Sequence, residues 1–258
     1  MIAAGIEYAA HGAGPPVICL HGIGGGIASF APQMAALPHH QVIAWNMPGY
    51  GASPPPEAGH NFAGLSDALA GLITALGQTG AHLVGQSIGG MIALDHALRR
   101  PDQVRSLTLI GTTPSFGGRD DSFKDAFLKA RLAPLEAGKT MAQMATEAAP
   151  HLVGPLADDA CRRAVAAPMA DVPPETWRSI LRCLVTFNRR ADLENIAVPA
   201  CLIAGSHDQN APARTMEKMA AKIPGAAFHL IEGAGHMINQ EAPAAVNQIL
   251  AAFLKEQP

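Results

Sequence analysis

The sequence has little charge, few aromatic side chains and no long apolar run. Charged residues make up 15% of its 258 residues and aromatic residues 5%, with 18 Lys and Arg against 21 Asp and Glu. This near-neutral balance lacks the positive field by which proteins bind nucleic acids or anionic membranes. The first residues do not resemble a signal peptide, and no stretch is long enough to be a membrane span. We therefore expect no nucleic-acid partner, no membrane association and a cytoplasmic location.

Cysteine is also scarce. The four cysteines form no Cys-x-x-Cys pair and no Cys/His spacing typical of zinc, and Cys19 and Cys201 lie inside apolar runs. We interpret all four as reduced core or near-core residues and expect neither a metal nor another cofactor. A domain of this length buries about 70–75% of its unfolded surface, so it needs no such reinforcement to fold. We expect a monomer or a homodimer.

Short apolar runs alternate with helical patterns over most of the chain. Helical spacing covers 65–76, 90–98 and 244–253. The strand candidates are 17–20, 41–45, 81–84, 105–110, 200–204 and 226–231, with a weak hairpin over 2–9. Strands that alternate with helices are typical of an α/β fold, in which a mostly parallel, twisted sheet is flanked by helices.

The alternation is interrupted between Ile110 and Ala200. From about 115 to 190 no segment reads as a strand, but apolar residues recur at helical intervals, broken by prolines 134, 150, 155, 168, 173 and 174. This segment carries 11 Lys and Arg against 9 Asp and Glu, whereas the rest of the chain carries 7 against 12. We predict a helical cap at 115–190, inserted into an α/β core formed by 1–114 and 191–258.

Ser87 lies in the strongest chemical motif, Gly-Gln-Ser-Ile-Gly at 85–89. The motif follows an apolar strand and precedes a helical pattern. A serine on such a sharp turn exposes its hydroxyl for attack, and the N-terminus of the following helix directs N–H groups at charge that develops on a bound oxygen. Glycine-rich turns at this place also bind phosphates or merely reverse the chain. The order of strand, turn and helix favours a nucleophile.

A second glycine-rich loop, His-Gly-Ile-Gly-Gly-Gly at 21–26, follows the first parallel strand candidate. Because its backbone is free to direct N–H groups at a substrate oxygen, we predict that this loop and the amide of Ile88 together form an oxyanion hole. Ile23 is the preferred second donor and Gly24 the alternative. A phosphate-binding loop is disfavoured because the segment lacks a Lys-Ser/Thr pair and the full dinucleotide-binding pattern. We expect His21 to support the loop through a hydrogen bond.

A serine hydroxyl needs a base, and that base needs an acid to orient it. His236 follows the last strand candidate on a glycine-rich loop, and Asp208 follows the strand before it. Because parallel strands end at the same edge of a sheet, we expect both side chains near Ser87. These three residues are the predicted catalytic triad.

Other acids and bases fit this role less well. His207 as the base would leave His236 without a role. Asp95 lies in a helical pattern that carries it away from the edge of the sheet. We interpret Asp192 and Glu194 as surface or helix-end charges.

With these motifs the chain resembles the α/β-hydrolase superfamily, in its branch of small capped bacterial serine esterases and enol-lactonases. The resemblance covers essentially the whole length, from HGIGGG through GQSIGGMIAL and IAGSHDQNAP to GAGHMINQEAP. It implies the α/β-hydrolase fold and the triad named above. One departure is Asn46, where such relatives usually carry Asp in an Asp-x-x-Gly-x-Gly-x-Ser segment. That position is usually structural, so the change bears on loop bonding rather than on catalysis.

The type of nucleophile narrows the chemistry. Dehalogenases and epoxide hydrolases that resemble this chain use Asp in place of Ser87, because alkyl carbons require a carboxylate nucleophile, so a serine favours acyl transfer. We predict hydrolysis of a small-molecule carboxylic ester or lactone through an acyl-enzyme. Ring-fission C–C hydrolases are an alternative, although they typically carry Asn in place of Gln86 and a Gly-Pro-Gly loop in place of 24–26. A ligand receptor or interaction module without turnover is a second alternative.

The cap is expected to line the substrate pocket. Apolar residues at helical spacing more often form the cap's own core, so both interpretations stand for Phe116, Phe123, Met141, Met144 and Trp177, with Met237 beside the base. The cap is also rich in arginine, which permits a carboxylate-bearing substrate because guanidinium pairs bidentately with carboxylate; a solvated surface gives the same count. These arginines are Arg119, Arg131, Arg162, Arg163, Arg178, Arg182, Arg189 and Arg190.

Overall fold

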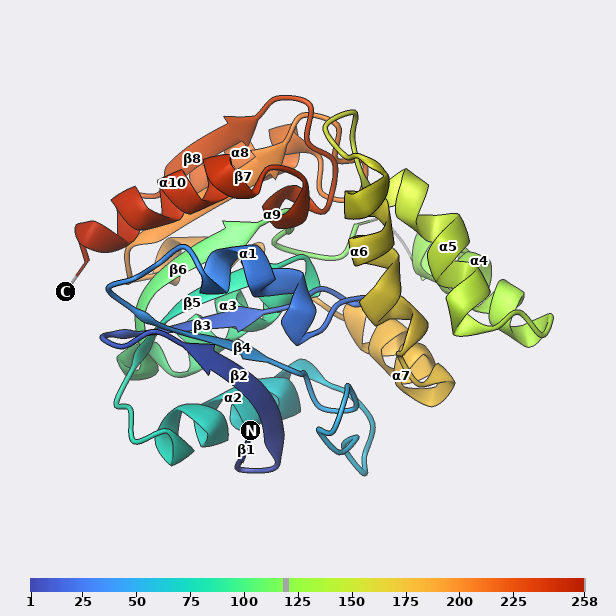
Figure 1. Ribbon diagram of the computed structural model, residues 1–258, viewed down its shortest axis with the longest axis horizontal. Coiled ribbons are helices and arrows are strands. Elements are labelled where there is room, and N and C mark those ends of the chain that lie inside the picture. Colours follow the sequence, from blue (N-terminus) through green and yellow to red (C-terminus); the bar gives the residue numbers. More distant parts are fainter. Residues whose placement is uncertain (118–120, 258) are drawn as a thin grey trace.

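The computed structural model describes residues 1–117 and 121–257 and has a single eight-stranded sheet at its centre (Figure 1). The order across the sheet is β1-β2-β4-β3-β5-β6-β7-β8. β1 and β2 pair antiparallel, β2 pairs antiparallel with β4, and every later pair is parallel. The strands are β1 Ile2–Ala3, β2 Ile6–His11, β3 Pro16–Leu20, β4 Gln41–Trp45, β5 Ala81–Gln86, β6 Val104–Ile110, β7 Ala200–Gly205 and β8 Ala227–Ile231.

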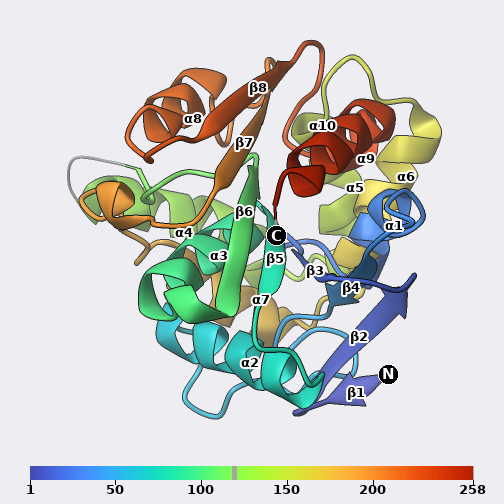
Figure 2. The same ribbon diagram turned by 90° about the vertical axis from the view of Figure 1, so that its left-hand side faces the viewer.

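Helices cover both faces of this sheet, and the alternation of side chains along each strand explains why. In β3, Ile18 and Leu20 point into one apolar cluster, whereas Val17 and Cys19 point into the other. The first cluster is closed by α2 (Phe62–Ala75), α3 (Ile88–Arg99) and α8 (Ala213–Ala220), and the second by α1 (Ala31–Met34) and α10 (Pro243–Lys255) (Figure 2). A strand buried on both faces reads as a continuous apolar run, which is the signal in the sequence.

Among the described residues, four further α-helices lie between β6 and β7 in the chain and form a separate group beside the sheet (Figure 1). They are α4 Asp121–Glu136, α5 Met141–Leu152, α6 Asp159–Ala170 and α7 Pro174–Leu184, and we call them the inserted helices. The sequence suggested that the prolines in this segment break its helices, but three of them do not. Pro134, Pro150 and Pro168 lie inside α4, α5 and α6, each in the last turn, where a proline disturbs few following hydrogen bonds.

The predicted fold class is confirmed. Each strand candidate corresponds to an observed strand, and the weak hairpin is the β1–β2 pair. The three predicted helices of the core correspond to α2, α3 and α10. The short helices α1, α8 and α9 (Ile238–Glu241) were not predicted, because so few turns give little periodicity. Within the described residues, no helix combines the length and apolar character required to cross a bilayer.

Three histidines are held in the core without charge. Burial lowers the pKa of His82 to about 4, helped by the positive charges of His40 and Arg105. Burial likewise lowers the pKa values of His21 and His96 to about 4, although hydrogen bonds to Gly22 and Ser66 partly oppose the shift. In the unfolded chain these histidines titrate near 6.5. Between that pH and about 4 the unfolded state therefore binds more protons than the folded state.

We expect the free energy of unfolding to fall as the pH is lowered from about 6.5 toward 4, by about 1–2 kcal/mol for each histidine at pH 5. Urea unfolding curves measured at pH 7, 6 and 5 check this. His82→Gln removes one titrating group and should make the fall with pH shallower, whereas the control His11→Gln, at an exposed position, should not. Equal stability of the wild-type protein at pH 7 and pH 5 would contradict the prediction.

Candidate active site

Ser87 occupies the turn between β5 and α3 and has a φ of 54°, a left-handed value that is rare outside glycine. Its N–H donates to the Ile110 carbonyl at 2.9 Å, and its carbonyl accepts from Thr112 Oγ1 at 2.8 Å. Glycines on either side leave room for this turn. A Cβ at Gly85 would meet the backbone of Gly89, and a Cβ at Gly89 would meet the backbone of β3. The backbone strain is thus held by a tightly packed crossing of strand and helix.

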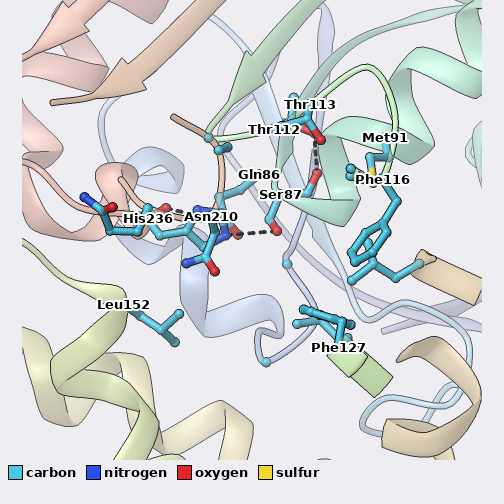
Figure 3. A pocket seen from close by; sticks show the side chains of 18 of the residues that line it. Gln86, Ser87, Met91, Thr112, Thr113, Phe116, Phe127, Leu152, Asn210 and His236 are labelled. Carbon is cyan, nitrogen blue, oxygen red and sulfur yellow. Dashed lines mark hydrogen bonds between the residues drawn. The ribbon is translucent and has the colours of Figure 1, made fainter. Parts of the chain in front are cut away.

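A hydrogen-bonded relay connects Ser87 to two loops at the same edge of the sheet (Figure 3). His236 Nε2 lies 3.0 Å from Ser87 Oγ, and His236 Nδ1 lies 2.8 Å from Asp208 Oδ2. Since the ionised carboxylate only accepts hydrogen bonds, Nδ1 carries the proton and Nε2 is free to accept the serine proton. The structure therefore brings together the three residues that the sequence nominated.

Asp208 is buried and ionised. Burial alone would raise its pKa, but attraction by His236, the hydrogen bond from that ring and two backbone N–H groups together hold the pKa below its usual value. The two amides belong to Asn210 and Ala211 and lie 2.8 and 2.9 Å from Oδ1. A fixed negative charge beside Nδ1 stabilises the imidazolium that forms when Nε2 takes a proton.

Glu241 clamps the loop that carries His236. This buried carboxylate accepts three backbone hydrogen bonds: from Gly235 at 2.9 Å, from Met237 at 3.0 Å and from Gly154 at 2.6 Å. Gly235 and Met237 flank the histidine, whereas Gly154 belongs to the segment between α5 and α6. The histidine loop is therefore tied to the inserted helices. No motif in the sequence pointed to Glu241.

The glycine-rich loop after β3 is held by buried polar groups. His21 donates from Nδ1 to the Gly22 carbonyl at 2.8 Å and accepts the Met47 N–H at Nε2, at 3.0 Å, which is the supporting role expected for it. Tyr50 packs edge-on against this ring and donates its hydroxyl proton to the Ile23 carbonyl at 2.7 Å. The loop is thereby fixed beside Ser87.

The two predicted oxyanion donors occupy different surroundings. Ile23 and Gly24 both line the cavity above Ser87. Ile88 is fully buried and its side chain packs in the core, but its amide is the first of α3 and has no acceptor within the helix. A Cβ at Gly24 would touch Met169 of α6, so the inserted helices also press on this loop.

The hydrogen bonds of Asn46 show how the chain accommodates an amide where similar proteins usually carry Asp. Its Oδ1 accepts the Ile27 N–H at 3.0 Å, and its Nδ2 donates to Glu7 Oε2 at 2.7 Å. Glu7 also accepts the Ala52 N–H at 2.7 Å, and these hydrogen bonds from Ala52 and Asn46 lower its pKa. The negative charge that such relatives carry at position 46 is here supplied by β2, with the amide as a bridge.

A cavity of about 450 Å³ opens over Ser87, between the sheet edge and the inserted helices. Four predicted pocket residues line it: Phe116, Phe123, Trp177 and Met237. Met141 and Met144 do not line it, which corrects the prediction. Both are buried in the apolar core to which the inserted helices contribute, because their helical spacing places them on the packed face of α5. Lining residues that the sequence did not suggest include Thr113, Ser115, Phe127, Leu152, Leu181 and Asn210.

Figure 3 shows how the labelled side chains surround this cavity. His236 and Asn210 lie on one side, Phe116 and Phe127 on the other, and Ser87 lies between them. The competing residues from the sequence lie elsewhere: Asp95 is buried in ion pairs with Arg99 and Arg189, and His207 is exposed. Among the described residues, no group of three or more His, Cys, Asp or Glu is arranged to hold a metal.

Comparison with known proteins defines the class. Residues 15–243 match the model of the alpha/beta hydrolase fold family, so the chain belongs to this family. A protein from Azorhizobium caulinodans named as a RutD carbamate hydrolase is 30% identical, over 98% of this chain and 96% of its own length. One from Variovorax paradoxus with the same name is also 30% identical, over 96% of each chain.

Solved structures agree with the fold. An enol-lactonase from Burkholderia xenovorans superimposes with a TM-score of 0.84 at 26% identity, over 97% of this chain and 96% of that chain. An esterase from Thermogutta terrifontis gives a TM-score of 0.87 at 24% identity, over 97% and 93% of the two chains, which shows likeness of fold alone. The family and its hydrolase relatives support hydrolase activity for this chain.

We expect Glu241→Gln to lower kcat roughly tenfold or more and to reduce stability by about 2 kcal/mol. The amide keeps the shape but offers one acceptor oxygen to three N–H donors, so the histidine loop loses its clamp. Kinetics on a neutral ester and urea unfolding measure both effects. The matched control is Glu232→Gln, which removes the same charge from an exposed position on the same loop. Equal loss in both variants would show that charge alone matters.

Proposed function

We propose that this protein hydrolyses a small-molecule carboxylic ester or lactone, with Ser87 as nucleophile, His236 as base and Asp208 as the acid that orients it. The observation that carries the proposal is the relay of 3.0 and 2.8 Å hydrogen bonds at the floor of the cavity. A serine hydroxyl with an oriented neutral imidazole at this distance is prepared for acyl transfer.

The first half of the reaction forms an acyl-enzyme. Ser87 Oγ attacks the substrate carbonyl while its proton passes to His236 Nε2, and the carbonyl oxygen takes up the negative charge. The amides of Ile88 and Ile23, with Gly24 as the alternative to Ile23, are the proposed donors to this oxyanion. His236 then gives the proton to the leaving alkoxide, and the bond between carbonyl carbon and alcohol oxygen breaks.

The second half restores the enzyme. A water molecule gives a proton to His236 Nε2 and attacks the acyl carbon, which forms a second tetrahedral intermediate at the same donors. This intermediate expels Ser87 Oγ, which takes its proton back from His236, and the carboxylic acid leaves. Each step uses only the relay, the oxyanion donors and water, so the proposed chemistry needs no cofactor.

The inserted helices are the proposed cap, with 115–190 as the cap segment and 1–114 and 191–258 as the core. Their Trp177 and Leu181, with Phe116 and Phe123, give the cavity a largely apolar wall. A volume of about 450 Å³ is in the range of pockets that bind drug-sized ligands. This favours a substrate with a hydrocarbon or ring portion attached to the scissile carbonyl.

A carbamate substrate is the second candidate, and the names of the relatives favour it. Proteins named as RutD carbamate hydrolases match this chain over nearly its full length. The same relay serves a carbonyl that carries nitrogen. The cavity is larger than a small carbamate ion needs, and its apolar walls offer such an ion few polar partners. We therefore place the ester or lactone first.

Replacement of the nucleophile tests the mechanism. We expect Ser87→Ala to lower kcat on 4-nitrophenyl hexanoate by a factor on the order of 10⁵–10⁶, because no other group forms the acyl-enzyme. A serine-directed fluorophosphonate should label the wild-type protein once and Ser87→Ala not at all. Thr79→Ala, which removes an exposed hydroxyl before the start of β5, whereas Ser87 follows the end of that strand, is the control. Full esterase activity in Ser87→Ala would refute the mechanism, and labelling without turnover would favour a receptor.

The two candidate substrates are separated by an isosteric pair. 4-Nitrophenyl hexanoate and 4-nitrophenyl N-butylcarbamate differ only in a CH₂ group replaced by NH beside the carbonyl. We expect kcat/KM to be at least roughly tenfold higher for the ester, because nitrogen conjugation makes the carbamate carbonyl less electrophilic. A higher kcat/KM for the carbamate, lost in Ser87→Ala, would reverse the order of the two proposals.

A further inference from the structure

The arginines of the inserted segment divide into distinct groups. Arg119 lies outside the described residues. Arg162, Arg178 and Arg189 pair with Asp159 at 2.8 Å, Glu175 at 2.7 Å and Asp95 at 2.6 Å. Arg163 and Arg182 are exposed and do not line the cavity. Arg131 and Arg190 do line it.

Arg190 is anchored to the wall of the cavity. Its Nη2 donates to the Ser115 hydroxyl at 3.0 Å, and Ser115 is itself a buried lining residue. The chain on both sides is fixed, because Ser115 pairs with Asn188 in an antiparallel bridge and Phe116 N–H donates to the Phe187 carbonyl at 2.8 Å. One hydrogen bond to Ser115 leaves the other guanidinium donors free for a ligand.

Arg131 belongs to the same wall. Its guanidinium lies 5.4 Å from the centre of the Phe127 ring, a cation–π contact. The Phe127 and Phe116 rings meet edge to face at 4.8 Å, and Phe116 follows Ser115 directly. A continuous set of contacts therefore joins Arg131, the two phenylalanines, Ser115 and Arg190. Figure 3 shows the two phenylalanines across the cavity from His236.

Within residues 1–117 and 121–257, no acidic side chain neutralises either guanidinium. In the described part of the chain, no Asp or Glu lines the cavity, and neither Arg131 nor Arg190 forms an ion pair. The nearest acid to the chemistry, Asp208, is buried behind His236 and already accepts hydrogen bonds from that ring and two amides. The cavity thus has two positive groups that no acidic residue in the described ranges compensates, in a protein whose net charge is -3.

We propose that Arg190 and Arg131 form a subsite for a carboxylate on the substrate, separated from the scissile carbonyl by the hydrocarbon portion that packs on Phe116 and Phe127. This inference rests on the proposed function, because it places the reacting carbonyl at Ser87. Guanidinium and carboxylate match in shape and form paired hydrogen bonds. Phe127, which contacts Arg131, and Phe116, which follows Ser115, give this wall an apolar surface that suits a hydrocarbon spacer and not a second polar group.

A pair of esters that differ only in charge tests the subsite. 4-Nitrophenyl hydrogen adipate carries a free carboxylate at the far end of its acyl chain, and 4-nitrophenyl methyl adipate carries the same chain with that carboxylate methylated. We expect kcat/KM of the wild-type protein to be roughly tenfold higher for the anionic ester. Because Arg190 is exposed, added salt should reduce this preference.

Variants of the arginines test which residues cause the preference for the anionic ester. Arg190→Gln and Arg131→Gln should each lower the ratio of the two kcat/KM values toward one, and Arg190→Lys should keep part of it, because charge remains but the paired geometry is lost. Arg182→Gln, which removes the same charge from an exposed site outside the cavity, should leave both activities and their ratio unchanged. Thermal unfolding of each variant checks that it is folded.

The outcomes separate the subsite from the proposed function. Ser87-dependent hydrolysis of the neutral ester, with no anionic preference or with one that both glutamine variants retain, would overturn the subsite alone. If neither ester were cleaved, the proposed function would fall, and calorimetric binding of adipate would decide the subsite. Binding that is lost in Arg190→Gln would support it, whereas absent binding, or equal binding of adipate and inorganic phosphate, would overturn it.

Discussion

The buried hydrogen bond between His236 and Asp208 is the interaction on which the arrangement of the site depends. It joins the loop after β8 to the loop after β7 and fixes which imidazole nitrogen faces Ser87. A buried carboxylate is tolerated there only because the ring and two backbone amides supply hydrogen bonds that outweigh its desolvation. The parallel sheet makes these bonds achievable, because it ends β5, β7 and β8 at one edge.

The inserted helices are attached to this edge at several separate points. Glu241 and the Leu152 carbonyl, which accepts the His236 N–H at 2.7 Å, tie the α5–α6 region to the histidine loop. Thr176 of α7 donates to the Gly49 carbonyl at 3.0 Å, and Arg189, which follows α7, donates to Asp95 of α3. These attachments reach the histidine loop, the loop after β4 and the helix that follows Ser87. A change in the packing of the inserted helices would therefore alter both the volume of the cavity and the position of the base.

The sequence predicted the fold well and the site in part. Central parallel strands such as β3, β5 and β7 are buried on both faces and give short apolar runs, which the alternation with helical patterns identifies as strands. The residues that follow β5, β7 and β8 were nominated because strand ends share an edge, and their catalytic role stays a prediction. Helical periodicity shows that a face is buried but not what it faces, which is why Met141 and Met144 were placed in the pocket. Glu241 and the Arg189–Asp95 pair, 94 residues apart in the chain, depend on packing between distant segments and left no local pattern.

The charged groups of this site differ in their exposure to solvent, because Asp208 is buried and Arg190 is exposed. Asp208 is buried, so its interaction with the imidazolium is screened little and acts on the chemical steps. Arg190 is exposed at the wall of the cavity, where solvent and salt weaken its field over the distance to Ser87. Its effect is therefore expected on recognition of the substrate and only weakly on the transition state. The two charges have separate partners, because Asp208 is buried behind His236 and accepts hydrogen bonds from that ring and two amides, whereas Arg190 donates to Ser115 and Arg131 contacts Phe127.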